Sequence, residues 1–159
     1  MQRRRGVVAS LLTIAALLAA MVVNAGEAYA QDCYHSLGPG GDAACHWPGP
    51  GNDDANAIIS QSSGGAVTAT FNISAGGATH ALWATVYLAQ CDGYGHNCST
   101  KAATSDPTSG SYKFATVAQA VVRISQYSFG HTYKACGSAK DYTIGWVNLL
   151  NVCSPTIYN

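Results

Sequence analysis

The side chains that could do chemistry in this chain are aspartates, histidines, serines and cysteines, since Glu27 is its only glutamate. A hydrolytic serine would need glycines at fixed spacing around a sharp turn, and no such motif occurs. Paired carboxylates for glycosidic cleavage would have to come from Asp53 and Asp54, the only adjacent acidic pair. Adjacent residues of an extended chain point to opposite sides, so we interpret this pair as a solvated turn. The sequence therefore predicts a protein that is not an enzyme.

Two histidines raise the question of a metal site. His35 and His46 lie beside the expected Cys33–Cys45 loop and, with Asp42, could converge on zinc or copper. Their spacing does not resemble a compact metal motif, which favours solvent-exposed loop histidines. Residues 51–56 offer oxygen ligands for calcium but lack the order of acidic residues and the distal glutamate of a calcium loop. The sequence therefore predicts no metal site and no cofactor.

A sugar-binding aromatic shelf is a further possibility. The side chains that could form it are His80, Trp83, Tyr87, Tyr127, Tyr133 and Trp146. Most of them lie on predicted strands, where aromatic residues ordinarily fill a core. Core packing is therefore the favoured interpretation.

Residues 1–30 have the pattern of a secretory signal peptide. Arg3, Arg4 and Arg5 precede an almost wholly apolar run over 7–23, and Ala28-Tyr29-Ala30 fits a signal-peptidase site. The apolar run is at the short edge of a membrane span and ends in a cleavage site. We therefore expect a secreted, extracellular protein that starts near Gln31 and has no membrane anchor after signal cleavage.

The 129 residues that follow carry few charges. Five lysine and arginine residues face seven aspartates, which gives a formal charge of −2. Nucleic acids and anionic lipids are bound by clustered basic residues, so neither is expected as a partner. The length is that of a single domain.

Six cysteines remain in this part of the chain. In an exported protein they predict three disulfides, for which 15 connectivities are possible. Proximity in the sequence favours the pairs Cys33–Cys45, Cys91–Cys98 and Cys136–Cys153.

Alternation of apolar and polar residues predicts strands over most of the chain. The expected strands lie at 66–73, 79–91, 97–104, 111–129 and 142–153. Both faces of 79–91 are largely apolar, so this strand should be central. For 111–129 a short helix is the alternative. Several short strands between turns favour a β-sandwich, with a small closed barrel as the second choice.

The segment 31–56 differs from the rest because it is rich in glycine and proline, which excludes a helix and makes a strand improbable. The predicted fold is therefore all-β, a single disulfide-braced β-sandwich with an extended N-terminal arm. Its divisions are a signal peptide at 1–30, the arm at 31–56 and the sandwich at 57–159.

Two roles remain open for the arm. It could cover an edge strand of its own domain, or it could lie in a groove of a larger secreted protein. The candidate partner-binding residues are Tyr34, His35, Leu37, His46 and Trp47.

Three stretches carry a resemblance to a known group of proteins. Val86–Cys91, Tyr133–Gly137 and Trp146–Cys153 look like segments of the small secreted β-proteins of actinobacteria. In its size, export signal, single β-domain and N-terminal arm, the chain is similar to the small adaptor subunit of the umbrella toxin particles of Streptomyces. This resemblance implies an adaptor that joins a lectin-bearing subunit to a large toxin subunit, with the arm in a cleft of the former. It implies no catalytic residue.

The second hypothesis is a secreted protease inhibitor. In such a protein a disulfide-braced loop occupies the active site of the protease. Ser36-Leu37-Gly38 or Thr100-Lys101-Ala102 could serve as that loop.

Overall fold

The computed structural model describes residues 32–35, 41–49, 53–144 and 149–158. Among these residues there is no helix with the length and apolar character needed to cross a membrane. The predicted signal peptide lies outside the described residues. The strands are β1 (Asp32–His35), β2 (Asp42–Pro48), β3 (Asp53–Gln61), β4 (Val67–Ala75), β5 (His80–Cys91), β6 (Ser99–Asp106), β7 (Lys113–Ala115), β8 (Val117–Ile124), β9 (Thr132–Asp141), β10 (Leu149–Cys153) and β11 (Ile157–Tyr158).

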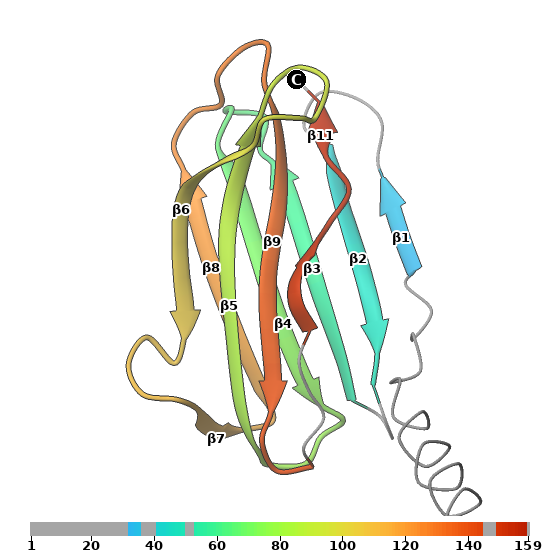
Figure 1. Ribbon diagram of the computed structural model, residues 1–159, viewed down its shortest axis with the longest axis vertical. Helices are drawn as coiled ribbons and strands as arrows, with labels where there is room; N and C mark the ends of the chain where they lie inside the picture. The colour runs from blue at the N-terminus through green and yellow to red at the C-terminus, as the bar shows by residue number, and fades with distance from the viewer. Residues whose placement is uncertain (1–31, 36–40, 50–52, 145–148, 159) are drawn as a thin grey trace, which may run out of the picture.

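The strands form two antiparallel sheets (Figure 1). One sheet has the order β1-β2-β3-β4-β8. The other has the order β10-β9-β5-β6, with β11 paired to β9 and β7 paired to β5. Because β4 of the first sheet contacts β5 and β9 of the second, the sheets pack face to face. The predicted all-β class is confirmed, and β5 has strands on both sides, as expected for a central strand.

Alternating side chains build the core between the two sheets. Every second residue of β3 and β4 is buried. Many of the core residues are alanines, which lets the sheets approach closely. At Gly137 of β9, an added Cβ would lie 2.3 Å from the carbonyl oxygen of Thr85 and 2.5 Å from the Phe71 ring. The core therefore requires a glycine opposite Phe71.

The strand predicted over 111–129 is confirmed in its main part, as β7 and β8, and the helical alternative is wrong. In contrast, the sequence pattern does not predict β9. The small and charged residues of β9 have low strand propensity, but the strand pairs with β5 along its whole length. Tertiary pairing therefore outweighs local propensity in this strand.

The strand predicted over 142–153 is wrong in its first part. Residues 142–144 form a bend, and β10 spans Leu149–Cys153. The Oδ1 atom of Asp141 accepts a hydrogen bond from the N–H of Thr143 at 2.8 Å, which turns the chain at the end of β9. Residues 145–148, which include Trp146, lie outside the described residues.

The N-terminal segment is not the strand-free arm that its glycines and prolines predict. It contributes β1 and β2, and the division predicted at residue 57 falls inside β3. Gly41 and Gly49 lie just before β2 and just after it. In this part of the chain the turn-forming residues separate strands and do not prevent them, which is why the prediction was wrong.

Three disulfides join the strands, and they are the pairs favoured by proximity. The pairs are Cys33–Cys45, Cys91–Cys98 and Cys136–Cys153. The first joins register partners of β1 and β2, the second closes the β5–β6 connection, and the third joins register partners of β9 and β10. Three disulfides are compatible with folding in an oxidising, extracellular compartment.

Candidate functional site

The two ends of this two-sheet body differ in construction (Figure 1). One end, here named the loop end, consists of the connections 62–66, 92–98 and 125–131. The opposite end, named the cluster end, lies where β3 and β5 begin and β9 ends. Because neighbouring strands are antiparallel, each end gathers side chains from distant parts of the sequence.

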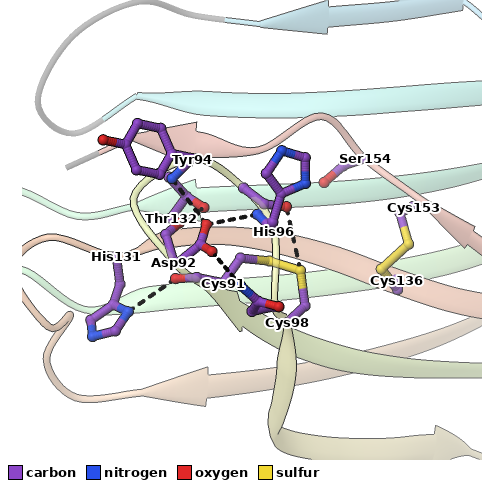
Figure 2. Close-up of a disulfide and its surroundings, with 12 residues drawn as sticks. Cys91, Asp92, Tyr94, His96, Cys98, His131, Thr132, Cys136, Cys153 and Ser154 are labelled. Atoms are coloured by element: carbon purple, nitrogen blue, oxygen red, sulfur yellow. Dashed lines mark hydrogen bonds between the residues drawn. A yellow bond between two sulfur atoms is a disulfide. The ribbon is translucent and has the colours of Figure 1, made fainter.

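At the loop end, one carboxylate organises the 92–98 connection (Figure 2). The Oδ1 atom of Asp92 accepts hydrogen bonds from the N–H groups of Tyr94 at 3.0 Å and His96 at 2.8 Å. Its Oδ2 atom accepts one from the side-chain amide of Asn97 at 2.8 Å. The Cys91–Cys98 disulfide closes the same loop. The loop is therefore ordered by its own side chains and needs no partner to define its shape.

These hydrogen bonds favour the charged form of Asp92. The pKa of its carboxyl lies below its ordinary value, and the largest cause is the backbone N–H of His96. The loop is also attached to β9, because the hydroxyl of Thr132 donates to the carbonyl oxygen of Asp92 at 3.0 Å. At neutral pH the loop thus keeps its carboxylate ionised and its geometry fixed.

The neighbouring connection 125–131 is anchored through its backbone. The N–H of Tyr127 donates to the carbonyl oxygen of Gly65 at 2.9 Å. The N–H of Ser128 donates to the hydroxyl oxygen of Tyr133 at 2.7 Å, and this buried hydroxyl also accepts from the amide of Gln90 at 3.1 Å. This connection is therefore attached to the β3–β4 turn on one side and to the core on the other.

Two large rings project from these anchored loops. The side chain of Tyr94 is 87% exposed and that of Phe129 is 90% exposed. The two loops touch, since an added Cβ at Gly93 would lie 3.2 Å from the carbonyl oxygen of Gly130. A groove of about 430 Å³ adjoins the second ring and is lined by Ser63, Gly64, Gly65, Gln126, Tyr127 and Phe129. The loop end thus offers apolar surface on an ordered backbone.

At the cluster end, three titratable side chains face one another between the sheets. Asp53 and His80 are the first residues of β3 and β5, and Asp141 is the last residue of β9. Each is two positions along its strand from a buried core residue, so alternation turns it inward. One ligand-type atom of each residue lies within 4.8 Å of those of the other two.

The three groups of the cluster are unequally satisfied. The Nδ1 atom of His80 lies 2.5 Å from Oδ2 of Asp141, whose other oxygen accepts the N–H of Thr143. The Oδ2 atom of Asp53 is buried and has no hydrogen-bond partner among the described residues. Burial, followed by the nearby charge of Asp141, raises the pKa of the Asp53 carboxyl. Two carboxylates and an imidazole in this arrangement can share a proton or hold a cation.

Beside this cluster lies an exposed aromatic patch formed by Tyr112, Phe114 and Tyr142. The ring centroid of Tyr112 lies 5.5 Å from each of the other two. Lys140 places its ammonium group 5.9 Å from the Tyr142 centroid. The rings of this patch contact one another, so part of their apolar surface is already covered.

The structure separates the residues predicted to bind a partner. Tyr34 of β1 is 56% exposed, and His35 and His46 are partly exposed. The Nε2 atom of His46 lies 3.5 Å from Oδ2 of Asp54. Leu37 lies outside the described residues. Tyr34, His35 and His46 thus remain accessible on β1 and β2.

Trp47 has a different role from the one predicted. Its side chain is 5% exposed, and its ring stacks on Phe71 with centroids 6.2 Å apart. Alternation along β2 turns this residue inward. Trp47, predicted to fill a pocket of a partner, fills the core of its own chain instead.

The structure also tests the possible metal site at His35 and His46 and the turn expected at Asp53 and Asp54. In the β1–β2 ladder, His35 and His46 lie three register positions apart, on the order of 10 Å, so they do not converge. The pair Asp53 and Asp54 is not a solvated turn, because it begins β3. The two carboxylates do point apart, as expected for adjacent strand residues, and Asp53 is the buried one.

Among the described residues, the side chains considered for an aromatic shelf lie in different parts of the molecule. Trp83 and Tyr87 are partly buried on β5, Tyr133 is buried, Tyr127 lies at the loop end, His80 belongs to the cluster, and Trp146 lies outside the described residues. The aromatic patch at the cluster end consists of other residues.

Comparison of the chain with protein-family models, with curated proteins and with solved structures gives no match.

Proposed function

We propose that the protein is a secreted, non-enzymatic adaptor that joins larger secreted proteins, and that the loop end is its main partner surface. The observation that carries this proposal is the exposure of Tyr94 and Phe129 on two hydrogen-bonded loops that touch. Buried aromatic anchors supply much of the energy of protein interfaces. Because Asp92 and the Cys91–Cys98 disulfide already order one loop, binding loses little conformational entropy.

The chemistry of the loop end favours a protein partner with an apolar pocket. The connections 62–66, 92–98 and 125–131 contain no lysine or arginine, and their only formal charge at neutral pH is Asp92. This carboxylate is turned into its own loop by three hydrogen bonds. A neutral surface with two exposed rings suits burial of apolar area and does not suit a phosphate backbone.

An adaptor needs a second surface, and β1 is the candidate. β1 is the outer strand of its sheet among the described residues, and Tyr34 is exposed on it. An edge strand can accept a strand of another chain through backbone hydrogen bonds. His35 and His46, also expected to bind a partner, would contribute to this second surface. A toxin particle, as the resemblance implies, is the assembly that we propose for such an adaptor.

A secreted protease inhibitor is the second candidate function. The closed 92–98 loop with Tyr94 at an exposed position favours it. However, proteases hold substrate-like loops in extended form, whereas this loop turns at Gly95 and Asn97, whose φ values are 80° and 50°. The predicted inhibitory segment Thr100-Lys101-Ala102 lies within β6 and is paired with β5. Equimolar inhibition of one protease in a panel, lost in Tyr94→Ala, would favour the inhibitor.

Photo-crosslinking from single positions tests the adaptor proposal. A photoreactive side chain is placed at position 94 or 129 in the protein secreted by its producing organism. The expected result is one defined, larger protein crosslinked from both positions, and a different one from position 34. The matched control is position 112, an exposed aromatic at the cluster end. Equal adducts from 94 and 112, or none from either loop position, would contradict the proposal.

A further inference from the structure

The cluster end holds a set of metal-binding groups that the proposed adaptor role does not use. Asp53, His80 and Asp141 supply two carboxylates and one imidazole, with ligand-type atoms within 4.8 Å of one another. Ligands at about 2.0–2.2 Å from a zinc ion lie roughly 3 to 3.5 Å apart. Small side-chain rotations would therefore bring the three groups to coordination distance.

A second, independent observation points to a cation in the same place. The Oδ2 atom of Asp53 is buried and unpartnered among the described residues, and the whole residue is 7% exposed. A buried polar atom without a partner is costly, and native proteins rarely leave one. A metal ion between Asp53 and the other two groups would satisfy this oxygen.

We propose that Asp53, His80 and Asp141 bind one divalent transition-metal ion, for which Zn²⁺ is the best match. An imidazole nitrogen with carboxylate oxygens is a donor set that zinc accepts at four-coordinate sites. Calcium prefers six to eight oxygen ligands, and two carboxylates fall short of that number. The side chain of His80 is 16% exposed, so an ion can reach the imidazole from solvent.

The surroundings of Asp141 prepare it for this role. Its Oδ1 atom accepts the N–H of Thr143 at 2.8 Å, which directs Oδ2 toward His80. Hydrogen bonds of this kind orient the carboxylates that bind metals. Metal binding would use an unprotonated ring nitrogen of His80 and the carboxylate forms of Asp53 and Asp141.

The chain offers a matched control for a titration. Asp54 is adjacent to Asp53 but points outward, where its side chain is 38% exposed and lies 3.5 Å from His46. Asp53→Asn and Asp54→Asn thus make the same chemical change, one inside the cluster and one on the surface. Asp53→Asn should fold, because burial already favours an uncharged side chain at this position.

Calorimetric titration of the metal-free, full protein with Zn²⁺ tests the proposal. The expected result is one equivalent bound with a Kd of about 1 µM or tighter, weakened at least tenfold by Asp53→Asn and unchanged by Asp54→Asn. Circular dichroism of both variants checks the fold. Absence of binding by the unaltered protein would overturn the proposal, as would weakening by Asp54→Asn alone, which would place the ion on the surface pair.

A second readout identifies the histidine ligand and does not depend on the first variant. In protein labelled with ¹⁵N-histidine, Zn²⁺ should shift the ring nitrogens of His80, which His80→Gln identifies in the spectrum. The four other histidines should change little. A shift at His46 or His35 with none at His80 would overturn the assignment. Ca²⁺ at the same concentration should leave all five unchanged.

Discussion

The loop end and the cluster end each contain an aspartate that organises backbone N–H groups, but in opposite environments. Asp92 is on the surface, and its carboxylate accepts three hydrogen bonds within its own loop. Asp141 is 1% exposed, turns the chain after β9 through Thr143 and contacts His80 with its second oxygen. The same interaction, a carboxylate that accepts backbone N–H groups, therefore orders an outward-facing loop at one end and an inward-facing cluster at the other.

This difference teaches what each end is suited to bind. At the loop end the Asp92 carboxylate is already hydrogen-bonded within its own loop, whereas the rings of Tyr94 and Phe129 are exposed. Binding there is therefore expected to depend on the burial of apolar area. Inside the cluster end, the unpartnered oxygen of Asp53 adds a cost that a bound cation could offset. The loop end is thus suited to a protein and the cluster end to an ion.

The largest expected effect comes from the shared middle of the molecule. Gly137→Ala places a Cβ against the Phe71 ring and the Thr85 carbonyl, where no space exists. We expect a loss of about 3 kcal/mol or more in the free energy of unfolding, measured by urea denaturation. Gly77→Ala, with open space around the site, is the matched glycine control for packing, although its φ of 95° carries a conformational cost. If Gly137→Ala unfolds at the same urea concentration as the unaltered protein, this would contradict the close approach of the sheets.

Replacing the aspartate that organises each end should lower the free energy of unfolding by different amounts at the two ends. Asp141→Ala leaves His80 without its partner in a largely buried site and removes the acceptor for Thr143. We expect about 3 kcal/mol of destabilisation. Asp92→Ala should cost less, because solvent can replace the lost hydrogen bonds of an exposed loop. If urea denaturation shows equal losses in the free energy of unfolding for Asp141→Ala and Asp92→Ala, the two aspartates do not differ in environment as described.

Loss of one disulfide should act locally at the loop end. The Cys91–Cys98 loop spans 7 residues in sequence and the Cys136–Cys153 loop spans 17. Alanine at both positions of the first pair should cost about 2 kcal/mol, and at both positions of the second pair somewhat more. Hydrogen exchange should speed up at 92–98 and stay unchanged at 141–144. Equal acceleration at both ends would show that the loop end is not independently ordered.

The smallest expected effects are two pH dependences of opposite sign in metal-free protein. The folded-state pKa of Asp92 is lowered, so its ionisation stabilises the fold above about pH 4, and this contribution is lost as the pH falls through the lowered pKa. The folded-state pKa of Asp53 is raised, so stability falls as the pH rises from the unfolded pKa to the raised value.

Asparagine variants separate these two contributions. Above both pKa values, Asp92→Asn should destabilise the protein and Asp53→Asn should stabilise it. Both differences should shrink toward zero at the lowest pH, where the carboxyls are protonated in both states. Thermal unfolding from pH 2.5 to 7 measures both. Differences of the same sign would contradict the assigned environments.

Local sequence patterns were sufficient to predict several strands and the disulfide pairs. Alternation predicted β4 and β5, and the spacing of the cysteines favoured all three observed disulfides. These features depend on neighbours in the sequence, which is why a single chain reveals them.

The cluster could not be predicted in the same way. Asp53, His80 and Asp141 come from three strands, and the last two are 61 positions apart in the sequence. Their meeting depends on the register of β9, a strand whose small residues give no strand signal. Inward alternation from Leu82 could have marked His80 as a core position, but it could not have supplied its partners. The exposure of Phe129 likewise depends on the anchoring of its loop by Tyr133.

The most direct test of the central claim compares the two ends with equal chemistry. One variant carries Tyr94→Ala and Phe129→Ala, and the other carries Tyr112→Ala and Phe114→Ala. Affinity for the partner that crosslinks at position 94 is measured for both by biolayer interferometry. Two buried aromatic anchors predict a loss of at least about 100-fold in the loop-end variant and little change in the other. An unchanged affinity in the loop-end variant, or a larger loss in the cluster-end variant, would contradict the account.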